Sequence, residues 1–250
     1  TYATTKGHLT QTKQNLRSTS NLTTEQKQNP KQSDSFIKIE SIHKNEITYS
    51  DQTGRFPIRS SRNNQYLFIL YDTASNHIFA QPIQTRSNKD IMSAYKKIYA
   101  DLQKAGITSQ LHILDNESSQ EFTTLLKQNH GRVQFVPPNV HRRNVAERAI
   151  RTFKGHLIAG LCSTHAHFPL HLWDRLVKQA QMTLNMMRES HIHPKISAYE
   201  HIYGCFDYNA TPMASPGTKS LIHLKNNQRG TWAPKAIEAW YIGPCMNHYR

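Results

Sequence analysis

The sequence predicts an α/β protein with a mixed five-stranded sheet flanked by helices, and three observations support this fold class. Three strand-like runs follow one another across short turns, which is typical of an antiparallel meander. Strand-like and helical segments then alternate, which is typical of parallel strands joined through helices. The run YLFILY at positions 66–71 is apolar throughout, as expected of a central strand covered on both faces.

Five segments are expected to be strands, because apolar and β-branched residues dominate them and turn residues bound them. Positions 72–76 (DTASN) have turn chemistry after the second strand. Pro137 and Pro138 end the last strand, since proline has no amide hydrogen to donate. The expected strands are 47–51, 66–71, 77–83, 111–114 and 133–136.

Four segments are expected to be helices, because apolar residues recur in them at helical spacing. Ser87 with Asp90, and Ser118 with Glu121, are capping-box pairs that start the first two helices. Glycine ends both of these helices, and a proline suits the first turn of the last one. The expected helices run from Ser87 to Gly106, from Ser118 to Gly131, from Asn144 to Cys162 and from Pro169 to Met187.

Composition divides the chain into three parts. Residues 1–40 are rich in Thr, Gln, Asn, Ser and Lys and are interpreted as a polar linker, mobile or weakly helical. Residues 45–205 carry the expected sheet and helices. Residues 206–250 are interpreted as a linker and a small β unit, and it stays open whether this unit is cut short at its end. Because the chain starts without Met, we interpret it as a piece of a longer polyprotein.

The net charge indicates a polyanionic partner. The chain has 31 Lys and Arg against 17 Asp and Glu, a formal charge of +14. Such a surface attracts nucleic acid, although an unselective basic surface is the alternative. No apolar run of about 18 residues occurs, so no membrane span is expected. The three cysteines form no CxxC pair, which argues against a disulfide framework or a cysteine zinc site and fits a reducing intracellular setting.

Three carboxylates fall on separate expected elements of the sheet region. Asp51 ends the first strand, Asp115 follows the fourth strand, and Glu147 lies in the first turn of the third helix. Arg151 and Lys154 follow Glu147 by four and seven positions, which places them on the same helix face. Taken singly, each carboxylate could be structural, as a strand-edge residue, an Asx turn or a helix cap. Their joint position favours a shared site.

The residue types in this set predict metal-dependent phosphoryl chemistry. Asp51, Asp115 and Glu147 could hold two Mg²⁺ or Mn²⁺ ions, because hard divalent cations prefer carboxylate oxygens. Two such ions roughly 4 Å apart can activate an attacking oxygen and stabilise the leaving one in an in-line displacement. Arg151 and Lys154 would hold phosphates beside the metals.

The ordered set of motifs resembles the retroviral and retrotransposon integrase catalytic core, of the ribonuclease H-like superfamily. The resemblance covers about residues 45–205 and has one departure in spacing, since 32 positions separate Asp115 from Glu147, fewer than is usual in the family. Glu117 and Val145 also stand where the family often has glycine. The matching segments are Leu114 to Glu117 with Phe122, Asn144 to Arg148 with Arg151 and Thr152, Tyr49 to Asp51 with YLFILYDTAS, and Pro194 to Gly204.

The resemblance implies a fold, an activity and partners. The fold would be ribonuclease H-like, and Asp51, Asp115 and Glu147 would be the family's catalytic triad. The activity would be that of a polynucleotidyl transferase that trims the 3′ ends of element DNA and joins them to target DNA. The partners would be element-end DNA, target DNA and further copies of the chain. An intracellular place, in the nucleus at integration, is implied too.

Alternatives stay open at three points. Asp72 competes with Asp51 as first acidic ligand, but it precedes Asp115 by only 43 positions and ends the second strand, whereas the family uses the first. In the loop before Glu147, His141, Arg142 and Arg143 are candidate phosphate contacts, or else a surface turn with incidental charge. The function could instead be that of a nuclease or transposase of the same fold, or of a catalytically decayed DNA-binding fragment.

Overall fold

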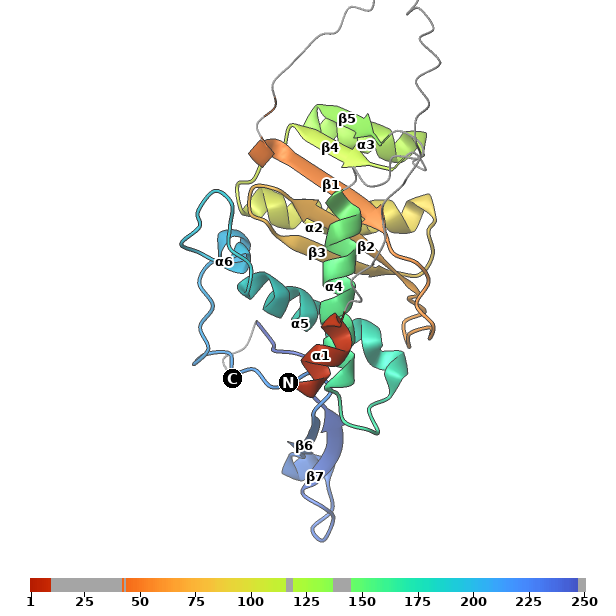
Figure 1. Ribbon diagram of the computed structural model, residues 1–250. Helices are drawn as coiled ribbons and strands as arrows, with labels where there is room; N and C mark the ends of the chain where they lie inside the picture. The colour runs from red at the N-terminus through yellow and green to blue at the C-terminus, as the bar shows by residue number, and fades with distance from the viewer. Residues whose placement is uncertain (10–41, 43, 116–118, 137–144, 247–250) are drawn as a thin grey trace, which may run out of the picture.

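The computed structural model describes residues 1–9, 42, 44–115, 119–136 and 145–246, and its centre is one five-stranded sheet of order β3-β2-β1-β4-β5 (Figure 1). Each expected strand is present within a residue or two of its predicted ends. The strands are β1 (Ile47–Gln52), β2 (Tyr66–Asp72), β3 (Ile78–Ile83), β4 (Leu111–Leu114) and β5 (Arg132–Phe135).

Strand directions make the sheet mixed, as predicted. β2 runs antiparallel to both β1 and β3, while β4 runs parallel to β1 and β5 runs parallel to β4. Four strands therefore share one direction and only β2 opposes them. Because of this, the carboxyl ends of β1, β3 and β4 meet at the same edge of the sheet, where open α/β sheets place their sites.

Helices cover both faces of the sheet (Figure 1). Apolar side chains of α2 (Asn88–Lys104) and α3 (Gln120–His130) share one buried cluster with β2, β3 and β4. Those of α4 (Val145–Cys162) and α5 (Trp173–Met186) share a second cluster with the opposite face of β2 and β3. This confirms the predicted α/β fold class, a mixed five-stranded sheet flanked by helices. The remaining short helices of the described core are η1 (Lys44–Glu46), η3 (Leu170–Leu172) and α6 (Ala198–Tyr203).

The helix starts differ in detail from the predicted capping boxes. Ser87 caps α2 by accepting the amide of Asp90, but the Asp90 carboxylate accepts from Thr85 instead of reaching back to Ser87. The cap of α3 is Ser119, whose hydroxyl accepts the amide of Phe122, so the prediction of Ser118 is wrong by one residue. Ser119 is favoured because its hydroxyl also donates to Asn88 on α2, a tertiary contact that sequence spacing does not reveal.

The helix expected from Pro169 begins later than predicted. Pro169 caps the 3-10 turn η3, and the α-helix starts at Trp173. Trp173 is fully buried, stacks on Phe56 with 4.2 Å between ring centroids, and donates its indole N–H to the carbonyl of Ile58 at 2.8 Å. This residue therefore belongs to the core and fastens the segment between β1 and β2.

Both ends of the described chain carry structure outside the sheet. Within the segment interpreted as a polar linker, residues Tyr2–His8 form a helix, α1, that packs on α4 (Figure 1). In the C-terminal part, β6 (Lys219–His223) and β7 (Ala236–Trp240) pair antiparallel around the 3-10 turn η4 (Asn226–Gln228), which agrees with the expected small β unit. Trp240 of this hairpin packs edge-on against Phe168. None of the helices in the described residues is long and apolar enough to span a membrane.

Replacing Phe153 with alanine tests how much the packing of α4 contributes to stability. The ring of Phe153 is fully buried between α4 and the sheet, so Phe153→Ala should lower the free energy of unfolding by about 3–5 kcal/mol. Thr152→Ala, at the exposed neighbouring position of the same helix, should change it by less than about 0.5 kcal/mol. Urea unfolding of both variants measures the difference, and equal losses would contradict this account of the core.

Candidate metal site at the sheet edge

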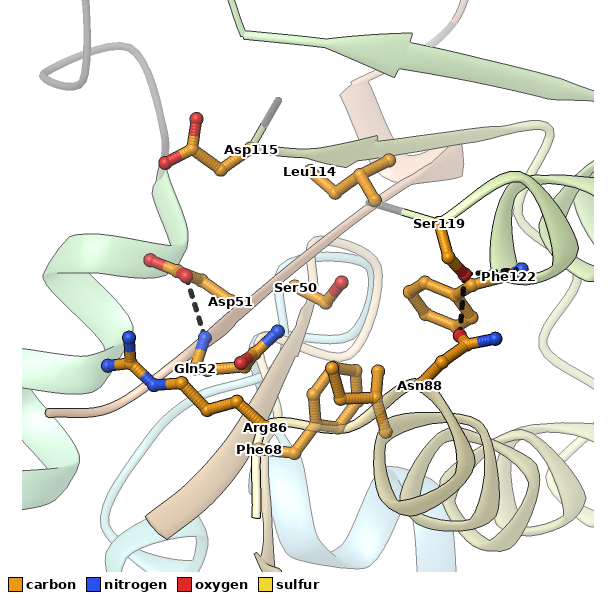
Figure 2. Close-up of a pocket in the computed structure, with 11 residues that line it drawn as sticks. Ser50, Asp51, Gln52, Phe68, Arg86, Asn88, Leu114, Asp115, Ser119 and Phe122 are labelled. Atoms are coloured by element: carbon orange, nitrogen blue, oxygen red, sulfur yellow. Dashed lines mark hydrogen bonds between the residues drawn. The ribbon is translucent and has the colours of Figure 1, made fainter. Parts of the chain in front are cut away.

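Asp51 and Asp115 lie side by side where β1 and β4 end. The parallel register pairs Ser50 with Leu114, so the next residue along each strand is an aspartate. Both line one pocket of about 280 Å³ (Figure 2). The predicted meeting of these two carboxylates is therefore present in the structure.

Strand alternation directs both carboxylates toward α4. Successive side chains along a strand point to opposite faces of the sheet. Ser50 bonds His112 on the α2 and α3 side, whereas Tyr49 packs in the cluster built on α4, and Asp51 has the same parity as Tyr49. Figure 2 shows the carboxylates of Asp51 and Asp115 on the side of α4, the pale green ribbon at the left.

The pKa of Asp51 is affected by the charges of both other predicted carboxylates. This pKa is raised to about 6, chiefly by burial, and the negative charges of Asp115 and then Glu147 contribute to the rise. A hydrogen bond from the Gln52 amide and the guanidinium of Arg86 act in the opposite direction. Glu147 thus lies within electrostatic reach of Asp51.

Glu147 nevertheless stands on a different part of the surface from the aspartates. It is exposed in the first turn of α4, and it lines a groove shared with α1 instead of the pocket that contains Asp51 and Asp115. Arg151 and Lys154 are exposed on the same helix and line this groove, as their spacing from Glu147 predicted. His141, Arg142 and Arg143 lie outside the described residues.

The donor chemistry fits divalent cations, but the three carboxylates are not gathered as ligands. Among the described residues, no three His, Cys, Asp or Glu side chains are arranged to hold one metal ion. Asp51 and Asp115 offer hard oxygen donors at one edge, and a bound cation would offset the burial and the like charges that raise the pKa of Asp51. The residues therefore suit Mg²⁺ or Mn²⁺, and Glu147 has to approach the aspartates to complete the set.

Asp72, the alternative first ligand, lies at the opposite edge of the sheet. Its strand runs against β1, and its Cα pairs with Thr48 near the start of β1. The Asp72 side chain is buried and accepts hydrogen bonds from the amide and the hydroxyl of Ser75. This geometry is that of an Asx turn between β2 and β3, and it separates Asp72 from Asp115.

A buried histidine beneath the site was not anticipated from the sequence. His112 of β4 is bonded through Nδ1 to the Thr48 hydroxyl and through Nε2 to the Ser50 hydroxyl, each at 2.8 Å. Burial lowers the pKa of His112 well below its usual value, so its ring is neutral. These bonds join β1 to β4 directly below Asp51. The alternation of Thr48 and Ser50 opposite a strand histidine is the signal that could have indicated them.

Arg86 is a second residue that sequence reasoning missed. It follows β3, whose carboxyl end lies at the same edge as those of β1 and β4. Its guanidinium donates to the carbonyl of Thr53 at 2.8 Å and helps line the pocket with Asp51 (Figure 2). Once the first three strands are predicted as a meander, the direction of the third strand places Arg86 beside Asp51.

Comparison with known proteins finds similar chains among solved structures. No protein-family model matches the chain, and no curated protein matches it. The solved structures that it resembles include the HTLV-2 integrase catalytic core domain in complex with magnesium, in a dimeric form, with 17% sequence identity, a TM-score of 0.47 and coverage of 66% of this chain and 99% of that one. The BIV integrase catalytic core domain has 18% sequence identity and a TM-score of 0.45, with coverage of 63% of this chain and 93% of that one. A chain of the simian T-cell lymphotropic virus intasome in complex with PP2A regulatory subunit B56 gamma has 19% sequence identity and a TM-score of 0.49. The match covers 80% of this chain and 67% of that one.

The raised pKa of Asp51 predicts a pH-dependent cost of folding in the metal-free protein. Asp51 binds its proton more tightly in the folded chain than in the unfolded one, so its stabilising contribution is lost as pH rises from about 4 to about 6. Asp51→Asn should therefore stabilise the protein by about 1–2 kcal/mol at pH 7 and by little at about pH 4, after allowance for solvent screening. Urea unfolding in EDTA at several pH values measures this.

The control for that measurement is Asp101→Asn, a charge-neutralising change on α2 that keeps an oxygen to accept the Tyr203 hydroxyl. It should show no comparable gain at neutral pH. An Asp51→Asn protein no more stable than the parent at pH 7 would contradict the raised pKa of Asp51.

Proposed function

We propose that this chain is the catalytic core of a metal-dependent integrase that joins retroelement DNA to target DNA. One observation supports the proposal above all. Asp51 of β1 and Asp115, the residue after β4, line one pocket at the carboxyl edge of the sheet, and the charge of Glu147 on α4 reaches Asp51. Beside them, α4 exposes Arg151 and Lys154. Acidic ligands next to a cationic helix face suit the handling of a phosphodiester.

In this proposal the carboxylates hold two divalent cations. Asp51 and Asp115 would provide ligands at the strand ends, and Glu147 would join them from the first turn of α4. When bound, such ions supply positive charge for an in-line phosphoryl displacement and make the attacking hydroxyl more acidic. Their positive charge would offset the burial and the like charges that raise the pKa of Asp51, so metal binding and ionisation of Asp51 would be coupled.

The proposed reaction proceeds in two displacements at the same site. A water oxygen first attacks a phosphodiester near the 3′ end of the element DNA, and a short end fragment leaves. The new 3′ hydroxyl then attacks a phosphodiester of the target, whose own 3′ oxygen leaves, and no bond to the protein forms. Arg151 and Lys154 would position the phosphates by charge and hydrogen bonding without reading base sequence.

The second candidate function is DNA binding without catalysis. The observation that favours it is the lack of three metal-competent ligands held together in the described part of the chain. Since the charge of Glu147 already reaches Asp51, we prefer the catalytic proposal, in which Glu147 approaches the two aspartates when metal binds. Strand transfer also separates an integrase from a nuclease of the same fold, because a nuclease yields cleavage alone.

The wider setting belongs to the same proposal. We propose that the chain is part of a Pol polyprotein, acts as a homo-oligomer, and works in the nucleus when element DNA is joined to the genome. The residues outside 45–205 would then serve as the end of a pre-integrase region and as a small C-terminal DNA-binding unit.

Neutralising Asp115 should abolish catalysis and leave DNA binding intact. Asp115→Asn removes a ligand charge without changing the size of the side chain, so Mn²⁺-dependent cleavage and strand transfer should fall below detection. Affinity for duplex DNA, and its steep decline with salt, should remain. Gel assays on element-end oligonucleotides measure the two reactions, and fluorescence anisotropy measures binding.

Asp101→Asn is the matched control, because it removes a carboxylate charge on α2 and keeps the acceptor for Tyr203. Its cleavage should equal that of the parent chain. Undiminished cleavage by Asp115→Asn would dismiss the proposed metal site. Loss of cleavage together with loss of DNA affinity would instead indicate that the substitution had damaged the surface or the fold.

A further inference from the structure

The helix α1 meets α4 at unusually close range, through glycine. A Cβ atom on Gly7 would lie 2.4 Å from the backbone nitrogen of Ala159, a distance that no side chain tolerates. A Cβ atom on Gly155 would lie 3.2 Å from Nδ1 of His8 and 3.3 Å from the carbonyl oxygen of Gly7. The two helices can therefore approach this closely only because Gly7 lacks a side chain, and the absence of one at Gly155 leaves room for His8.

This approach fixes the place of His8. Its ring lies over Gly155 and 6.0 Å from the ring of His156, measured between centroids. His156 is in turn hydrogen-bonded to the Thr183 hydroxyl of α5 at 2.9 Å. Burial chiefly, and the neighbouring His8 to a smaller extent, lower the pKa of His156. The imidazole of His8 remains exposed at the surface, on a support that involves α4 and α5.

The end of α1 and the outer face of α4 form one groove. Gly7, His8 and Leu9 line one side of it, and the residues on α4 line the other. Among these are Glu147 at one end and Arg151 and Lys154 along the wall. From Glu147 to Gly155 the helix advances about 12 Å, which equals the axial length of three to four nucleotides of one strand.

We propose that α1 is part of the DNA-binding surface and that His8 contacts a phosphate of the strand that leaves the carboxylate site along α4. The inference rests on the proposed function for the identity of the polyanion. An imidazole N–H donates to a phosphate oxygen whether the ring is neutral or protonated, so the contact does not require a charged His8. Arg151 and Lys154 lie between Glu147 and this contact, and the groove thus presents donors in a row.

Four variants of the full chain test the role of α1. His8→Ala removes the donor, and Gly7→Ala should displace α1, because the new methyl group meets the backbone of Ala159. Alanine forms helices better than glycine, so a weaker Gly7→Ala protein cannot be explained by a poorer helix. His8→Arg adds a charge at the proposed contact. Gly54→Ala is the control, since nothing lies within 4 Å of its added methyl group.

Binding is measured by fluorescence anisotropy with a labelled duplex oligonucleotide in EDTA, over a range of NaCl concentrations. His8→Ala and Gly7→Ala should each weaken binding about threefold to tenfold, as expected for one exposed phosphate contact. The double variant should be no weaker than the poorer single one, because both changes remove the same contact. His8→Arg should steepen the salt dependence by about 0.9 in the logarithmic slope, and Gly54→Ala should bind like the parent chain.

Parental affinity in His8→Ala, or an unchanged salt slope in His8→Arg, would overturn the inference. Weaker binding in Gly7→Ala alone would also overturn it, because α1 would then act without His8. The proposed function is tested separately from this inference. Binding in EDTA needs no metal, whereas the function is tested by the cleavage activity of Asp115→Asn.

Discussion

The packing of α4 against the sheet is the interaction on which the site depends. Ala146, Ala149, Phe153 and Leu157 are buried along one stripe of this helix and press it onto β1 and β2. That stripe fixes the rotation of the helix about its axis. Glu147, Arg151 and Lys154 are then exposed together, and Gly155 and Ala159 receive α1. The buried face of α4 thus fixes the helix on the sheet, and its exposed faces carry the charged residues and the contact with α1.

The polar side chains on the two faces of β1 have opposite effects on stability. On the side of α2 and α3, Thr48 and Ser50 are buried and use their hydroxyls to bond both ring nitrogens of His112. On the side of α4, Asp51 sits next to Asp115 with like charges in reach, and its pKa rises. The first arrangement stabilises the sheet, since every buried polar atom named has a partner. The second costs stability, which is common where a site is built for a charged ligand.

Local rules predicted the elements of the core, and long-range contacts account for what they missed. The strands and helices follow from periodicity, and Asp51 and Asp115 could be predicted because each stands at the end of a strand. Ser119 replaced Ser118 as a cap because of a bond to Asn88, and Arg86 is recognised only once the direction of β3 is known. The docking of α1 could not be predicted, since Gly7 is informative only when Ala159 is seen opposite it.

The position of α1 also explains how a segment with few apolar residues can form a helix that packs on α4. None of its residues is buried, so hydrophobic burial does not hold it. Its contact with α4 instead comes from backbone held against backbone, where glycine removes the steric barrier and many short-range dispersion contacts form. Such a contact depends on shape more than on area. A single methyl group at Gly7 is therefore a larger perturbation to this helix than the loss of any of its polar side chains.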